Sequence, residues 1–448
     1  MKRLRIGNGC GFWGDNLDAP WELTEGGRLD YLTLEYLAEL TMSILALQKQ
    51  RHPDAGYARD FLDVLQQLAP ILQPQPQLKI ITNAGGMNPH GCATQARAIL
   101  DQAGLHSRRI AMVDGDDLLP RLDQLLAQGH SFTNLDTGEP LSTVRDRIVS
   151  ANAYLGCKPI VSALQQGADI VITGRVADAS LTLGPAVYEF GWKWDDWDRL
   201  AAGTVAGHLI ECGAQATGGL WCNWQETDLA LVGYPIADLE EDGAFLLTKP
   251  PGSGGAVNRE TTTEQLLYEV GDPTAYLTPD VVADFTSVQL TECGQDEVRI
   301  TGACGKPATD SYKVSIAYRD GWTASGTLVI AGPAAAAKAR RCGEIIFERL
   351  RRARISPEHR NIECLGAGDC VPGVLPVVDA PEVVLRVTVR DANRAVVERF
   401  SKEFAPLVTS GPPGVTGYTT GRPAVREVFA YWPALVDKVA LTAKVRIL

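Results

Sequence analysis

Two side chains near the middle of the chain, His208 and Glu211, have the types and spacing of an acid–base pair. They lie in the segment 203–219, GTVAGHLIECGAQATGG, and on a helix this spacing puts them on one face. Such a pair can move a proton or supply two metal ligands, whereas the plainer interpretation is a structural hydrogen bond. No third ligand at a recognisable spacing supports a metal, and Gln215 is close enough in sequence to line the same pocket.

Three predicted strands in the first half of the chain end in glycine and polar residues. The strands run into GNGCGFWGDN, TNAGGMNPHG and TGRVADAS. Glycine lets the backbone approach a ligand, and the free N–H groups of a following helix attract an anion. We therefore predict a site for an anionic ligand, the alternative being three tight strand-to-helix turns. The predicted binding residues are Gly9, Gly11, Asp15, Asn83, Gly85, Gly86, Asn88, Thr173, Gly174, Arg175, Ser180, Gln215 and Lys249.

The same segments supply groups for proton transfer. We predict that Glu211 or Asp178 is the catalytic base, with His208 as the alternative. Arg175 or Lys249 would offset the charge of the substrate, although Lys249, in the loop TKPPGSGG, is equally interpretable as a solvated surface charge. We predict neither a cofactor nor a metal, because the dinucleotide-like GNGCGFWG lacks its third glycine and the chain has no P-loop, HExxH or GxSxG motif.

The elements that must position these residues alternate between strand and helix. Strands are predicted around LRIGNG, LKIITN, RIAMVD and ADIVIT, and helices over residues 29–50, ATQARAILDQAG and 145–166. This order predicts an α/β fold with a mainly parallel sheet covered by helices, in which ligands bind at the carboxyl ends of the strands. Short β-branched strands after Pro279, a long helix over 334–354 and a final strand KVALTAKVRIL predict an α+β C-terminal domain.

The length and composition of the chain limit its domain organisation, its binding partners and its location. A chain of 448 residues is too long for one hydrophobic core, so we predict two domains, residues 1–278 and 279–448. The net charge of -12 and the brief basic runs argue against nucleic-acid binding. The lack of a long apolar run argues against a membrane span, and ten dispersed cysteines with no signal-peptide pattern favour a cytoplasmic protein. A homo-oligomer is expected on general grounds.

Taken together and in order, several segments resemble the acyclic terpene utilisation AtuA-like family. They include GNGCGFWGDN, ITNAGGMNP, GADIVITGRVADASLTLGP, DDWDRLAAGTVAGHLIECGAQATGG, LTKPPGSGGAVNRETTTEQLLYEVGDP and FAPLVTSGPPGVTGYTTGRP. The resemblance implies a bacterial protein encoded near acyl-CoA catabolic enzymes, with no established reaction. It also implies a small separate ferredoxin-fold partner domain, of which this chain carries no obvious copy.

These observations favour an enzyme that acts on an acyl-CoA or a related small organic acid. A polar strand edge that stabilises an enolate-like oxyanion, with carboxylates and a histidine to move a proton, predicts a cofactor-independent hydratase, dehydratase or other lyase. The alternative is a non-catalytic binding or scaffolding subunit that works with a small partner.

Overall fold

The computed structural model describes residues 2–376, 379–417 and 421–448. The chain forms two compact units, one of Met1–Ala317 with Tyr431–Leu448 and one of Tyr318–Ala430. Residues 279–317 and 431–448, which the sequence analysis assigned to the C-terminal domain, belong to the larger unit.

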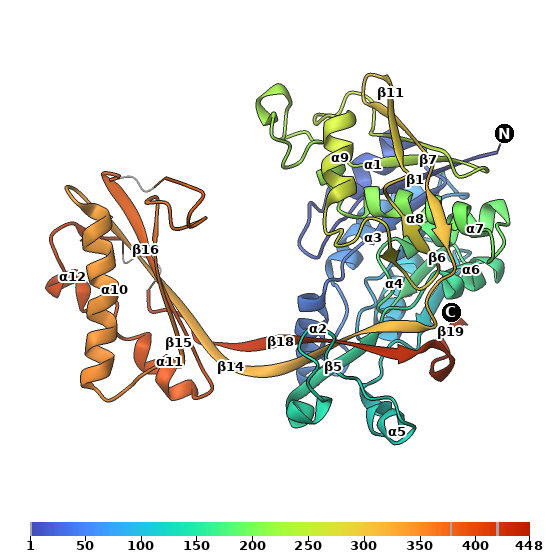
Figure 1. The fold of residues 1–448 in the computed structure, drawn as a ribbon. Helices are drawn as coiled ribbons and strands as arrows, with labels where there is room; N and C mark the ends of the chain where they lie inside the picture. Colours follow the sequence, from blue (N-terminus) through green and yellow to red (C-terminus); the bar gives the residue numbers. More distant parts are fainter. Residues whose placement is uncertain (1, 377–378, 418–420) are drawn as a thin grey trace. The chain divides into compact units, whose positions relative to one another are not determined.

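The larger unit is built on a ten-stranded sheet with the order β11-β12-β8-β7-β1-β2-β3-β6-β4-β19 (Figure 1). Its centre is parallel and consists of β1 (Arg3–Asn8), β2 (Tyr31–Leu34), β3 (Lys79–Thr82), β6 (Ile170–Thr173) and β4 (Ile110–Asp114). The antiparallel flanks are β7 (Ile236–Glu240), β8 (Phe245–Thr248), β12 (Glu297–Thr301) and β11 (Gln289–Gly294) on one side and β19 (Lys444–Ile447) on the other. The α/β class is therefore confirmed, with a sheet that is mixed rather than mainly parallel.

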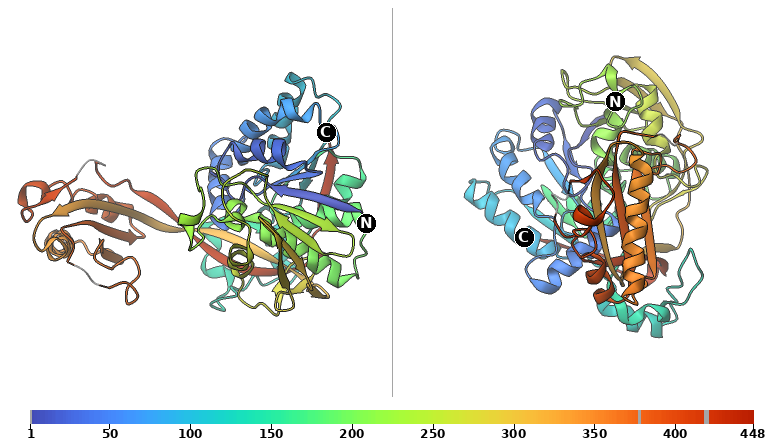
Figure 2. Two further views of the ribbon diagram at one scale, coloured as in Figure 1. Left: turned by 90° about the horizontal axis from the view of Figure 1, so that it is seen from above. Right: turned by 90° about the vertical axis from the view of Figure 1, so that its left-hand side faces the viewer.

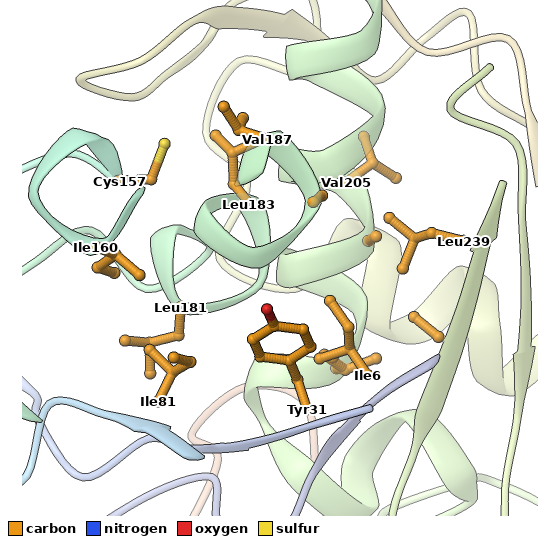
Figure 3. Packing of buried hydrophobic residues seen from close by; sticks show 14 of the residues in the cluster. Ile6, Tyr31, Ile81, Cys157, Ile160, Leu181, Leu183, Val187, Val205 and Leu239 are labelled. Atoms are coloured by element: carbon orange, nitrogen blue, oxygen red, sulfur yellow. The ribbon is translucent and has the colours of Figure 1, made fainter. Parts of the chain in front are cut away.

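Both faces of the parallel strands are covered by helices, which is why these strands are apolar without alternation. One face packs against α6 (Lys158–Gln165), α7 (Ser180–Phe190) and α8 (Trp197–Glu211), and the other against α1 (Ala19–Gly27), α2 (Glu39–Arg51), α3 (Asp60–Leu72) and α4 (Pro89–Gln102). Figure 3 shows Ile6, Tyr31 and Ile81 on the first face, beneath Leu181 of α7. Each fully buried aliphatic side chain of this kind stabilises the fold by about 1.5–3 kcal/mol, so the sheet is a rigid platform for its loops.

Two predicted helices were wrong in their first halves. Residues 29–50 form strand β2 and then helix α2, and residues 145–166 form β5 (Ile148–Ala153) and then α6. All four residues of β2 are buried, so its apolar run has no period of two and merges with the pattern of the helix that follows. The predicted helix through ATQARAILDQAG is confirmed as α4.

Further elements of the larger unit pack against α8. A small sheet of β9 (Tyr276–Leu277), β10 (Val282–Asp284) and β13 (Cys304–Lys306) packs against α8, as does α9 (Arg259–Leu267). The predicted C-terminal strand is β19, which pairs with β4 of the large sheet.

The smaller unit is a sheet covered by helices (Figure 2). Its strands include β15 (His359–Leu365), β16 (Glu382–Asp391) and β17 (Val415–Thr416), and its helices are α10 (Ala335–Arg352), α11 (Arg394–Phe400) and α12 (Leu407–Ser410). The long strands β14 (Ser311–Ala331) and β18 (Arg426–Asp437) pair with one another, and each has residues in both units; β5 also pairs with β14. Among the described residues, no helix has the length and apolar character needed to cross a bilayer.

Candidate active site

The five parallel strands each bring a buried polar side chain to their common carboxyl edge. In sheet order these are Asn8 at the end of β1, Glu35 after β2, Asn83 after β3, Arg175 after β6 and Asp116 after β4. Parallel strands end at the same edge, so residues distant in the sequence become neighbours there. We call these five residues the Arg175 row. It contains Asn83 and Arg175, two of the predicted binding residues, together with Glu35 and Asp116, which the sequence analysis missed.

Glu35 is held by the strand ends on either side of it. Its Oε1 accepts hydrogen bonds from Nδ2 of Asn83 and from the backbone N–H of Leu37, the latter at 3.2 Å. Its Oε2 is buried and has no hydrogen-bond partner among the described residues. Burial, followed by the charge of Asp178, raises the pKa of Glu35 well above its ordinary value. The site therefore favours the protonated form of this carboxyl group, which can donate a proton.

Arg175 is the fixed positive charge of the row. Its Nη1 lies 2.8 Å from Oδ1 of Asp178, 2.9 Å from the carbonyl oxygen of Leu37 and 3.8 Å from Oε1 of Glu35. The guanidinium carbon lies 4.2 Å from the centre of the Tyr154 ring, an arrangement stabilised by the cation–π attraction. Nε of Arg175 is buried without an acceptor among the described residues.

Asp116 fixes the backbone from which Arg175 projects. Its Oδ2 accepts hydrogen bonds from the backbone N–H of Arg175 at 2.9 Å and from Nδ2 of Asn152 at 2.8 Å. Burial raises the pKa of Asp116 to about 7. A Cβ on Gly174 would lie 2.3 Å from Oδ1 of Asp116, so only glycine allows this carboxyl group to approach.

His208 and Glu211 lie at the carboxyl end of α8, and the end of β1 holds them at the sheet edge. Nδ2 of Asn8 donates to the carbonyl oxygen of Glu211 at 2.9 Å. Nδ1 of His208 lies 3.2 Å from Oε1 of Glu211, and Nε2 lies 3.0 Å from the carbonyl oxygen of Gln265. Because a carbonyl only accepts, Nε2 carries a hydrogen and Nδ1 is the atom that exchanges a proton with Glu211.

Each of the two buried groups has a pKa above its ordinary value. Burial raises the pKa of Glu211 to about 7. Burial opposes protonation of His208, but the hydrogen bond and charge of Glu211 outweigh it, so the pKa of His208 is raised above its ordinary value. The pair can therefore hold or release a proton near neutral pH.

Electrostatic coupling joins the His208 pair to the Arg175 row. The charge of Asp178 raises the pKa of both Glu35 and Glu211, and Glu211 in turn raises that of Glu35. The side chain of Asp178 is 33% exposed, while those of Glu35 and Arg175 are buried. Within the part of the chain that the structure describes, no three His, Cys, Asp or Glu side chains are placed to bind a metal.

The predicted glycines serve close contacts within the protein itself. A Cβ on Gly11 would lie 2.6 Å from the carbonyl carbon of Cys212, and one on Gly85 would lie 2.5 Å from the carbonyl oxygen of Thr173. Gly9 and Gly86 are similarly packed, against Pro20 and Leu45. The buried Thr173 hydroxyl donates to the carbonyl oxygen of Gly174 at 2.8 Å. These residues hold the loops of the sheet edge together.

Two further predicted binding residues, Asn88 and Lys249, already have partners within the protein. Asn88 caps α4, with Oδ1 accepting from the N–H of Gly91 at 3.0 Å. Nζ of Lys249 donates to the carbonyl oxygen of Ser253 at 2.8 Å and lies 3.1 Å from Oδ2 of Asp296. The buried ammonium group is therefore not a solvated surface charge, and its partners explain its position without a substrate.

The remaining predicted residues are Asp15, Ser180 and Gln215. Asp15 accepts from the N–H of Gly11 at 2.8 Å and from the hydroxyl of Tyr234 at 2.5 Å, which fastens the loop after β1. The hydroxyl of Ser180 lies 3.5 Å from Oδ2 of Asp280. Gln215 is partly exposed in the short 3-10 helix after α8.

Comparison with known proteins adds one finding. The model of the family described as "Acyclic terpene utilisation family protein AtuA" matches residues 4–447. The match covers nearly the whole chain, so the chain belongs to this family and the predicted resemblance is confirmed. No curated protein and no solved structure gives a significant match.

Proposed function

We propose that this member of the acyclic terpene utilisation family is an enzyme of acyl-CoA or small organic acid catabolism, acting as a cofactor-independent hydratase, dehydratase or other lyase. The observation that supports the proposal is a buried arginine, Arg175, at the carboxyl edge of a parallel sheet: its Nη1 lies 2.8 Å from Asp178 and 3.8 Å from Glu35, and Glu211 is electrostatically coupled to both carboxyl groups. Carboxyl groups with different degrees of burial titrate differently, which allows one to act as an acid while another acts as a base.

The chemistry of a dehydration can be assigned to these groups. Glu211, held by His208, takes the proton from the carbon next to the substrate carbonyl. The electron pair forms a carbon–carbon double bond, and the protonated carboxyl group of Glu35 delivers a proton to the departing hydroxyl group, which leaves as water. Arg175 offsets the negative charge that develops on the carbonyl oxygen. Hydration is the reverse of these steps.

Turnover of a substrate panel tests this proposal. Purified protein is incubated with straight and branched 3-hydroxyacyl-CoA and enoyl-CoA thioesters and with the corresponding free acids, and gain or loss of water is followed by mass spectrometry. We expect turnover of at least one pair, and loss of about 10²–10⁴-fold in Glu211→Gln. Glu25→Gln, at an exposed position, is the matched control. Absence of turnover across the panel would reject the proposal.

The close packing of the predicted glycines favours a second candidate, a binding or scaffolding subunit. Gly11, Gly85 and Gly174 approach other atoms of the chain itself, so their presence needs no ligand. In this case a small separate partner domain would complete the protein. Copurification from the native host separates the two candidates, since a stoichiometric partner required for activity supports the subunit and an active isolated chain excludes it. Homo-oligomerisation and a cytoplasmic location remain predictions.

A further inference from the structure

A cavity of about 400 Å³ lies outside the Arg175 row. It is lined by Trp13, Gln48, His52, Ala55 and Arg59. Trp13 belongs to the loop after β1, Gln48 and His52 lie at the end of α2, and Arg59 directly precedes α3. This volume is within the range of about 300–1,000 Å³ that is usual for small-molecule sites.

Hydrogen bonds place this cavity at the same edge of the sheet as the candidate active site. The N–H of Met87, which follows β3, donates to the carbonyl oxygen of Gly56 at 2.8 Å, and the N–H of Ala58 donates to the carbonyl oxygen of Ala84 at 2.9 Å. The segment carrying Arg59 is therefore tied to the loop that begins with Asn83. The cavity shares no lining residue with the Arg175 row.

The polar side chains that line the cavity have donor and acceptor atoms that remain available to a ligand. Among the described residues, Arg59 and His52 form no ion pair, and the carboxamide of Gln48 forms no side-chain hydrogen bond. Asp54 and Asp60 are close by in sequence, but in the described part of the chain they pair with neither Arg59 nor His52. Gln48 and His52 are four positions apart, which puts them on the same side of the end of α2.

We propose that this cavity binds an adenosine phosphate. The indole of Trp13 offers a flat surface on which a purine stacks, and the carboxamide of Gln48 matches the donor and acceptor on the adenine edge. The guanidinium of Arg59 and the imidazole of His52 bind the phosphate. A neutral sugar would leave the charge of Arg59 unpaired, and inorganic phosphate would leave the indole uncovered.

Adenosine phosphate has two sources, a free adenine nucleotide and the carrier end of a coenzyme A thioester. The second source rests on the proposed function, whereas the site itself does not. Binding of ADP, coenzyme A, adenosine and inorganic phosphate to the full chain, measured by titration calorimetry, distinguishes the sources. Coenzyme A binding much more tightly than ADP identifies the thioester carrier, and equal or tighter ADP binding identifies the free nucleotide.

Substitutions in the lining test the placement of the site. We expect Trp13→Ala and Arg59→Met each to weaken ADP or coenzyme A binding by about tenfold or more, and Trp13→Phe to retain most of the affinity. Arg51→Met is the matched control, because Arg51 is an exposed arginine at the end of α2 that does not line the cavity. Unchanged thermal melting shows that each variant is folded.

Three results would overturn the inference. They are no binding of ADP or coenzyme A at millimolar concentration, affinities unchanged in both Trp13→Ala and Arg59→Met, and inorganic phosphate binding as tightly as ADP. Because binding is measured without turnover, a chain that binds nucleotide and converts no acyl-CoA retains this site while the proposed function fails.

Discussion

Nδ1 of His208 lies 3.2 Å from Oε1 of Glu211, and both side chains are buried where β1 packs against the end of α8. Nε2 of the same ring is committed to the carbonyl oxygen of Gln265. The titration of either group therefore depends on the other.

Replacing Glu211 by glutamine should lower the pKa of His208. In the native chain the hydrogen bond and charge of Glu211 overcome burial, so without the carboxylate burial dominates and the imidazole should titrate below its ordinary value of 6.5. NMR titration of labelled histidine side chains measures this change. An unchanged pKa of His208 would show that the pair is not coupled.

Asp116 should make the folded state less stable as pH rises. Its pKa is about 7 in the folded chain and 3.8 when unperturbed, so the stabilisation is complete below 3.8 and is lost as pH rises through about 7. The difference corresponds to about 4 kcal/mol at most. Urea unfolding over this pH range should show a flatter dependence of the free energy of unfolding on pH in Asp116→Asn than in the native chain. Parallel pH profiles for the native chain and Asp116→Asn would contradict this prediction.

Glu35→Gln and Glu35→Ala should differ in stability. The glutamine oxygen still accepts from Asn83 and Leu37, so the free energy of unfolding should change by less than about 1 kcal/mol. Alanine leaves both donors unpaired in a buried space and should cost about 3 kcal/mol. Chemical denaturation measures both values, and equal losses would show that the hydrogen bonds to Glu35 contribute little.

Gly11→Ala should destabilise the loop after β1. The new methyl group would lie 2.6 Å from the carbonyl carbon of Cys212, and the backbone displacement should cost about 1–3 kcal/mol. Gly271→Ala is the control, because a Cβ there meets nothing within 4 Å. Thermal unfolding of the two variants gives the comparison. If Gly11→Ala melts with the native chain, the close approach to Cys212 is not required.

The sequence by itself determined the α/β class, the family and several members of the candidate site. Arg175 and Asn83 follow buried strands, and polar residues after an apolar strand indicate a sheet edge. His208 and Glu211 have helical spacing, and α8 places them on one face as predicted. These features depend on local periodicity, which is visible in a linear chain.

Only the tertiary structure decided which polar groups meet. Glu35 was missed because β2 is buried on both faces, so the segment 29–50 has the apolar pattern of one helix. Lys249 was assigned to the site by its type, but its ammonium group pairs with Asp296. Pairing and burial depend on how strands are ordered in the sheet. That order brings Glu35, which follows β2, and Arg175, which follows β6, to 3.8 Å from each other across the end of β3, although they are far apart in the chain.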